Sequence, residues 1–447
     1  MFYARTGSAK LATLVAIALA SLCAVARAEE SPDADRESRA RVAILELLGG
    51  PGAQRRAELL ESLERLPLSI VAKVLESCGA PPSSPSESGE PHELSIDVPV
   101  PAAPRATYLV RLPPGYDRMG SYPVLVAMHH TGGQAQHMHS YWAASTDEHG
   151  VILVTPQATV NRNQGWGSTE IELATIMAVI RDVRRRFACD PDRIALTGMS
   201  MGGHATWEVG ILHGDEFAAL FPECGGPRKE LVPLVANLTG GLLLWQCQGA
   251  LDQPELVRAV RMGVERLERL GGSVVYEEAP DRGHVYFPER RDQRLDALLT
   301  AHREPLADRI DYLTVGPPAS RRQWLEITEI DEDAYHVGDQ LKLVFRGEKP
   351  TDEEMFEKMW RQIDKRLAKV DAQIDGNKII LRAKRVRRVR LHLDSTRFDP
   401  ERPILVKAGS KLLLRADVAP SVRTLLEAAL ATGDRSRRVD LVIDVDL

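Results

Sequence analysis

One short segment of the chain has the residue types that can make a nucleophile. Residues 193–204 read RIALTGMSMGGH, in which an apolar run leads into Gly198-x-Ser200-x-Gly202. This pattern is typical of a strand that turns sharply into a helix with a serine at the bend. The glycines allow the strand and the helix to approach closely, and the strained turn exposes the serine hydroxyl to a base. Because chance can supply so short a motif, its partners must be found elsewhere in the sequence.

A nucleophilic serine needs an imidazole to take its proton and a carboxylate to orient that imidazole. In sheets of this kind the order along the chain is serine, acid, histidine, on loops that follow successive strands. Asp252 follows the apolar run 242–247, and His284 follows the strand-like run 273–276. The sequence therefore predicts a triad of Ser200, Asp252 and His284. Glu255 and Asp281 are the alternative acids.

The developing oxyanion needs two backbone N–H donors. Met201, the first residue of the predicted helix after the serine, supplies one of them. The other is expected from the small, glycine-rich loop 129–133, HHTGG, which follows the apolar run 122–128. We predict the N–H of Thr131 as the second donor, with His130 as the alternative. His129 and Trp166 are candidates to line the substrate pocket.

These residues must be positioned by alternating strands and helices. From residue 93 onward, short apolar runs typical of buried strands alternate with longer segments of helical periodicity. Such alternation predicts an α/β unit with a mostly parallel sheet and helices on both faces. The expected strands are 94–99, 107–112, 122–128, 151–154, 194–197, 217–221, 242–247 and 273–276.

The remainder of the chain divides into four segments. Residues 1–28 combine basic residues, an apolar stretch and a small-x-small site, which predicts a secretory signal peptide cut after Ala28. Two amphipathic helices are expected in 29–78, forming a helical hairpin, and 79–92 is a Pro/Ser-rich linker. The catalytic unit then spans 93–310. Residues 311–447 are expected to form a β-rich, sandwich-like accessory domain with one amphipathic helix that begins at a Thr351/Glu354 capping box.

The accessory domain contains one strongly basic run. A solvated strand face is the simpler interpretation, and contact with a polyanionic surface is the alternative. The basic residues concerned are Arg382, Lys384, Arg385, Arg387, Arg388 and Arg390.

Composition restricts the function further. A net charge of −6 over 447 residues argues against a nucleic-acid-binding protein. After signal cleavage no membrane span is expected. The mature chain keeps Cys78, Cys189, Cys224 and Cys247, which are too widely spaced for a zinc motif and leave disulfides and free thiols both open. A histidine cluster at 129–139 lacks the acidic residues of a hydrolytic metal site. We expect no metal and no organic cofactor.

Together these motifs carry a family resemblance. Residues 93–305 resemble the α/β-hydrolase superfamily, and within it secreted esterases of the dienelactone-hydrolase, feruloyl-esterase and polyhydroxybutyrate-depolymerase type, close to prolyl-oligopeptidase catalytic domains. The resemblance rests on the His129 loop, Gly165-Trp166-Gly167, residues 190–193, 198–203 and 249–252, and Gly283-His284. One departure is His130, because such loops usually have glycine after the first histidine.

The resemblance implies an exported, periplasmic or extracellular serine hydrolase that cleaves a carboxylic ester through an acyl-serine intermediate. A serine peptidase on the same fold is the nearest alternative. The roughly 60 residues between the signal peptide and the sheet are too few for the propeller that such peptidases usually carry. A non-catalytic envelope- or glycan-binding protein with a decayed hydrolase core is the alternative from another class.

Overall fold

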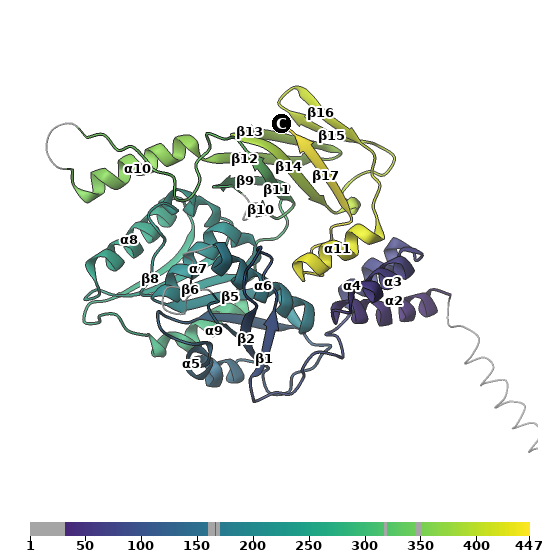
Figure 1. The fold of residues 1–447 in the computed structure, drawn as a ribbon, viewed down its shortest axis with the longest axis horizontal. Coiled ribbons are helices and arrows are strands. Elements are labelled where there is room, and N and C mark those ends of the chain that lie inside the picture. Colours follow the sequence, from purple (N-terminus) through teal and green to yellow (C-terminus); the bar gives the residue numbers. More distant parts are fainter. Residues whose placement is uncertain (1–31, 160–165, 167–169, 317–319, 346–349) are drawn as a thin grey trace, which may run out of the picture. The chain divides into compact units, whose positions relative to one another are not determined.

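The computed structural model describes residues 32–159, 166, 170–316, 320–345 and 350–447. These residues form two compact units, one ending at Cys78 and the other spanning Gly79–Leu447 (Figure 1). The predicted signal peptide at 1–28 lies outside the described residues. Among the described residues, no helix is both long enough and apolar enough to cross a bilayer.

The first unit has three helices, α2 (Pro32–Leu48), α3 (Ala53–Glu64) and α4 (Leu68–Ser77). The expectation of two helices was wrong because the apolar set 59–75 is interrupted at Pro67. This residue adopts an extended conformation (φ −57°, ψ 135°) at the start of α4, and a proline cannot continue the preceding helix. The apolar faces of α3 and α4 are both buried.

The second unit is built on an eight-stranded sheet in the order β1-β2-β4-β3-β5-β6-β7-β8. Strands β1 and β2 are antiparallel to their neighbours, and the other six run parallel. The predicted mostly parallel sheet is thereby confirmed. The strands are β1 (His92–Ile96), β2 (Ala106–Arg111), β3 (Tyr122–Met128), β4 (Ile152–Pro156), β5 (Cys189–Met199), β6 (Ala219–Glu223), β7 (Leu243–Gly249) and β8 (Ser273–Ala279).

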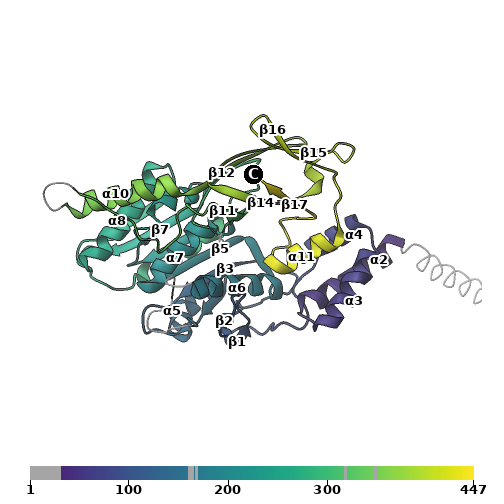
Figure 2. The ribbon, with the colours of Figure 1, turned by 45° about the horizontal axis from the view of Figure 1, so that its top comes forward.

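Helices cover both faces of this sheet (Figure 2). Val124 and Val126 of β3 belong to the core formed with α6, α7 and α8, whereas Leu125 and Ala127 belong to the core formed with α5 and α9. Alternate residues of one strand thus enter opposite cores, which is why β3 is apolar throughout. The helices are α5 (Ala135–Glu148), α6 (Glu170–Arg186), α7 (Met201–His213), α8 (Pro254–Arg269) and α9 (Arg291–Thr300).

The C-terminal region forms two further sheets around one core, as expected for a β-rich, sandwich-like region. One sheet has the order β10-β11-β14-β17 and the other β16-β15-β13-β12-β9. Thr351 and Glu354 form the predicted capping box at the start of α10 (Asp352–Arg366). The remaining elements are β9 (Arg309–Thr314), β10 (Arg321–Arg322), β11 (Leu325–Ile330), β12 (Ala368–Asp375), β13 (Lys378–Lys384), β14 (Val386–Leu393), β15 (Ile404–Ala408), β16 (Lys411–Ala416), α11 (Val422–Thr432) and β17 (Leu441–Asp446).

The basic run does not form one strand face. Arg385 has a positive φ of 58° and separates β13 from β14, which belong to different sheets. Acidic side chains also face most of the run. The ion pairs are Arg382–Asp371, Arg385–Asp333, Arg387–Asp331, Arg388–Asp446 and Arg390–Asp444. Contact with a polyanion stays a prediction. Most of the positive charges on this surface are already paired with acidic side chains of the protein.

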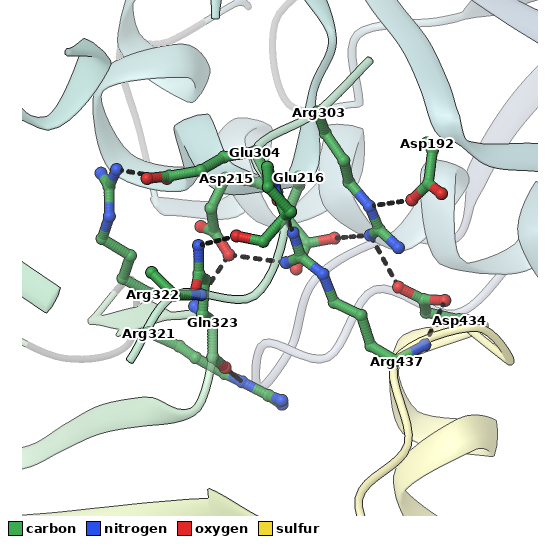
Figure 3. Close-up of polar contacts among 12 residues, drawn as sticks. Asp192, Asp215, Glu216, Arg303, Glu304, Arg321, Arg322, Gln323, Asp434 and Arg437 are labelled. Carbon is green, nitrogen blue, oxygen red and sulfur yellow. Dashed lines mark hydrogen bonds and ion pairs between the residues drawn. The ribbon is translucent and has the colours of Figure 1, made fainter. Parts of the chain in front are cut away.

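A buried ionic cluster joins the C-terminal region to the catalytic sheet (Figure 3). Arg303 contacts Asp192 at 2.7 Å and Asp434 at 2.7 Å, and it is 4% exposed. Burial alone would raise the pKa of Asp434, but Arg303 and Arg184 hold that pKa well below its usual range. We call Arg303, Asp192, Asp434 and Glu216 the Arg303 cluster. Arg303 thus links Asp192 of β5 to Asp434 of the C-terminal region.

Cys189, Cys224 and Cys247 are buried free thiols in the structure, and Cys78 is buried as well. The sequence left disulfides and free thiols both open, and the structure shows free thiols at these three positions.

Candidate active site

Ser200 occupies the turn between β5 and α7 in a strained conformation. Its φ of 57° and ψ of −115° lie outside the regions that residues with a side chain normally adopt. A Cβ atom at Gly202 would lie 2.3 Å from the carbonyl oxygen of Met128, and one at Gly198 would lie 2.5 Å from the backbone of Gly202. Both glycines are therefore required where the helix crosses the strand ends. This is the sharp turn predicted from the motif.

Asp252 and His284 form a hydrogen-bonded pair. His284 Nδ1 lies 2.8 Å from Asp252 Oδ2. Because a carboxylate accepts but does not donate, Nδ1 carries the proton and the lone pair of Nε2 is left available. The Asp252 side chain is fully buried, while the His284 side chain is 32% exposed. The carboxylate of the pair is thus enclosed by the protein, while the imidazole is partly accessible to solvent.

Two further donors hold the carboxylate. Gln248 Nε2 donates to Asp252 Oδ2 at 3.0 Å, and the N–H of Gln253 donates to Oδ1 at 2.7 Å. Gln248 is a supporting residue that the sequence analysis missed. The signal was present in the sequence, since Gln248 is a polar residue at the end of a buried strand, four positions before the acid.

The acid loop and the histidine loop are joined through their backbones. Leu251 N donates to the carbonyl oxygen of Arg282 at 2.8 Å. A Cβ atom at Gly249 would lie 2.1 Å from the carbonyl oxygen of Gly283, so only glycine fits there. The two loops that carry Asp252 and His284 therefore cannot move independently.

The end of β6 connects the serine turn to the histidine loop. Glu223 accepts a hydrogen bond from Ser200 N through its carbonyl oxygen at 2.8 Å, and one from Phe287 N through its carboxylate at 3.3 Å. Burial raises the pKa of Glu223, and the buried guanidinium of Arg294, which is paired with it, opposes that shift. Glu223 thus anchors both segments.

Cys224 follows directly and has a positive φ of 47°. Its thiol donates to the carbonyl oxygen of Val285 at 3.3 Å. Burial raises the pKa of this thiol to about 12, so it is neutral near pH 7. The ligand atoms of Cys224, Asp252 and His284 all lie within 4.8 Å of one another. Sequence reasoning did not connect this cysteine to the site.

The oxyanion loop follows β3 and lies against the start of α7. The Gly202 contact with the Met128 carbonyl places Met201 N–H, at the unpaired N-terminal turn of α7, beside this loop. His130 does not have a positive φ, whereas Gly132 has one of 73°. A histidine is therefore accommodated at 130 without strain, because the turn is made two residues later. The structure brings Met201, His130 and Thr131 to the same end of the sheet as Ser200.

His129 and Trp166 were predicted to line the substrate pocket, and this was wrong. They are 0% and 1% exposed, with ring centroids 5.1 Å apart. His129 Nδ1 donates to the carbonyl oxygen of His130 at 2.8 Å, and His129 Nε2 accepts from Ala158 N at 3.2 Å. The buried imidazole thus fixes the oxyanion loop from beneath. The neighbouring Gly165 and Gly167 lie outside the described residues.

One wide groove lies away from the serine and the histidine. It has a volume of about 1190 Å³ and runs between α8 and α10. Its lining includes Asp252 but neither Ser200 nor His284. We therefore do not assign it to the acyl group of a substrate.

The order of the strands and the serine turn after β5 are those of the α/β-hydrolase class of fold. Comparison with known proteins agrees with that class. The chain is 28% identical over 128 residues to the poly(3-hydroxyalkanoate) depolymerase C of Paucimonas lemoignei, covering 26% of this chain and 31% of that protein. It is 27% identical over 127 residues to a probable feruloyl esterase C of Aspergillus flavus, covering 27% of this chain and 46% of that protein.

The matched segments thus span less than half the length of these curated relatives. Among solved structures, a thermostable esterase matches with a TM-score of 0.40 and 21% identity, over 48% of this chain and 63% of that one. No protein-family model matches the chain. The eight-stranded sheet and the serine turn show an α/β-hydrolase fold, and the sequence relatives bear the names of a depolymerase and a feruloyl esterase.

Proposed function

We propose that the chain is an exported serine hydrolase that cleaves a carboxylic ester. The observation that carries this proposal is the 2.8 Å bond between Asp252 and His284, taken together with the strained strand-to-helix turn that holds Ser200. A buried carboxylate, a partly exposed imidazole and an activated hydroxyl are the three groups that acyl transfer requires.

In the proposed mechanism, His284 Nε2 accepts the hydroxyl proton as Ser200 Oγ attacks the ester carbonyl carbon. The oxyanion of the tetrahedral intermediate accepts hydrogen bonds from the N–H of Met201 and from Thr131 or His130. His284 then protonates the leaving alcohol, and the acyl group remains on Ser200. A water molecule, deprotonated by the same imidazole, releases the acid and restores the serine.

The rim of the site favours an apolar ester. Leu251, next to Asp252, is 69% exposed, and Val285, next to His284, is 45% exposed. The Leu251–Arg282 backbone bond keeps their two loops side by side. Tyr286 adds an aromatic ring, whose centroid lies 6.1 Å from that of His130. These side chains offer apolar contact to a substrate group that extends out of the site.

The substrate class is tested with p-nitrophenyl esters of increasing acyl length and feruloyl esters, assayed beside prolyl and alanyl amides. We expect the esters to be turned over faster than the amides. A preference for the amides would instead support the peptidase on the same fold. Leu251→Ser and Val285→Ser should raise KM for long acyl groups while leaving KM for the acetate ester nearly unchanged.

Export rests on the sequence pattern of residues 1–28. The test is N-terminal sequencing of the protein recovered from the periplasm or the medium. A mature chain that begins at Glu29 is expected, because cleavage is predicted after Ala28. An intact N-terminus in the cytoplasm would contradict export and leave the hydrolase proposal standing.

A further inference from the structure

We propose that Cys224, Asp252 and His284 form a site for a thiophilic divalent cation such as Zn²⁺, and that occupation of this site turns the imidazole base off. The proposal goes beyond the hydrolase function. The claim that a bound cation inhibits catalysis rests on the proposed hydrolase function. The claim that the site binds a cation does not.

The ligand types fit such an ion. A thiol, a carboxylate and an imidazole are the three side chains that bind Zn²⁺ in proteins, and their ligand atoms here lie within 4.8 Å of one another. Tetrahedral zinc needs ligand atoms separated by roughly 3.4–3.6 Å. The site is therefore formed if the Asp252–His284 pair opens slightly from 2.8 Å and the sulfur moves inward. Within the described residues, this is the one group of three metal-binding side chains that lie so close together.

The charges also fit. A thiolate and a carboxylate together carry two negative charges, so a divalent cation leaves the buried part of the site neutral. Cys224 and Asp252 are 0% and 7% exposed, and the partly exposed His284 gives the ion a path from solvent. With three protein ligands, a water molecule completes the tetrahedron on the open side.

Binding would change the tautomer of His284. In the metal-free pair, Nδ1 carries the proton and Nε2 keeps its lone pair. A cation bound through Nδ1 uses the lone pair of that atom, so the single proton of the neutral ring must reside on Nε2. The thiol loses its proton to solvent, which is the net proton released. The nitrogen that should accept the Ser200 proton is then already protonated, and attack on the ester is prevented.

The neighbouring thiols provide a matched control. Cys247 belongs to the same buried cluster as Cys224, and the Cys224 N–H donates to its carbonyl oxygen at 3.0 Å. Cys247 is nevertheless not one of the three clustered ligands. Cys224→Ser keeps a hydroxyl that can donate to Val285 but removes the soft sulfur ligand. Circular dichroism confirms that each variant is folded before it is used.

The binding test uses Co²⁺ as a spectroscopic probe on the full chain. We expect a near-ultraviolet cobalt–thiolate charge-transfer band that saturates at one ion per chain, is displaced by Zn²⁺, and is kept by Cys247→Ser. Cys224→Ser should lose the band. Failure of the wild type to show the band, or its persistence in Cys224→Ser, would overturn the proposal even in a fully active hydrolase.

The inhibition test measures ester hydrolysis against Zn²⁺ concentration, each variant being normalised to its own rate without zinc. Zinc should inhibit the wild type and Cys247→Ser, with full recovery on addition of a chelator. Cys224→Ser should need about tenfold more zinc, or higher. Equal sensitivity of Cys224→Ser and the wild type would reject the switch. A wild type without any esterase activity would instead reject the proposed function, and the cobalt band would still decide whether the site exists.

Discussion

The N–H of Ser200 donates a hydrogen bond to the carbonyl oxygen of Glu223 at 2.8 Å. Through this bond the strained serine turn is held by the end of the next strand, β6. The carboxylate of the same glutamate holds Phe287 N, three residues after His284. Ser200 and the loop that carries His284 are therefore both held by one residue at the end of β6. In the proposed mechanism, the relative positions of Ser200 and His284 depend on these two hydrogen bonds.

A first prediction concerns Gly202, whose added Cβ would meet the Met128 carbonyl oxygen at 2.3 Å. Because backbone atoms cannot rotate away, Gly202→Ala should displace the start of α7 and with it Met201 N–H. We expect a loss of about 1–3 kcal/mol in the free energy of unfolding, and a fall in kcat at temperatures where the variant is folded. Gly52→Ala is the control, since nothing lies within 4 Å of the added atom. Unchanged kcat in Gly202→Ala would refute the close approach.

A second prediction concerns Gln248, which donates to the Asp252 carboxylate at 3.0 Å. A hydrogen bond to a charged group contributes about 1.5–3 kcal/mol. Gln248→Met should therefore lower kcat roughly 10- to 100-fold, with little change in KM. Gln246→Met is the matched control. Gln246 is equally buried in β7, but its side chain accepts a hydrogen bond from Trp207 rather than donating one to Asp252. That control should lose stability and keep its kcat. Equal kcat values in the two variants would show that the hydrogen bond from Gln248 to Asp252 does not contribute to catalysis.

A third prediction concerns the Arg303 cluster. Removing the guanidinium leaves Asp434 and Asp192 without their buried counter-charge. Arg303→Leu should lower the free energy of unfolding by about 3–5 kcal/mol. Arg309→Ala, which breaks an exposed pair with Asp371, should leave the midpoint of denaturation unchanged within error. A wild-type midpoint in Arg303→Leu would show that the cluster does not hold the two regions together.

The same cluster makes the protein sensitive to acid. Burial would raise the pKa of Glu216, but Arg184, Arg437 and Arg303 lower it to about 2 from an ordinary value of 4.5. The unfolded chain therefore binds protons before the folded one does as the pH falls. The stabilisation is fully present above the ordinary value and is lost between about pH 4.5 and pH 2. Denaturation midpoints measured across this window should fall in the wild type and fall less in Arg303→Leu.

The sequence predicted the parts of the site that depend on local order. Ser200, Asp252 and His284 each follow a buried strand, and parallel strands bring their carboxyl ends together. The Asp252–His284 pairing and the sharp turn at Ser200 were therefore predictable without coordinates. The mostly parallel sheet followed from the alternation of short apolar runs and helical segments.

Other features depend on packing between distant segments. Cys224 reaches His284 only because β6 ends beneath the histidine loop, 60 residues along the chain, and no local pattern marks that contact. His129 and Trp166 resemble pocket residues in sequence, yet their rings pack together in the core. Pro67 indicates a break between two helices. One helix was nevertheless predicted there, because the apolar residues on either side of Pro67 keep the same helical spacing.

The central claim is that Ser200 is a nucleophile activated by His284. The direct measurement is reaction of the purified full chain with a fluorophosphonate probe, followed by mass spectrometry of the labelled peptide. Labelling is expected on Ser200 in the wild type, at least about 1,000-fold slower labelling in His284→Ala, and none in Ser200→Ala. Ester hydrolysis should fall in parallel with labelling. Folded Ser200→Ala protein that still reacts with the probe, or still hydrolyses esters at the wild-type rate, would contradict the account.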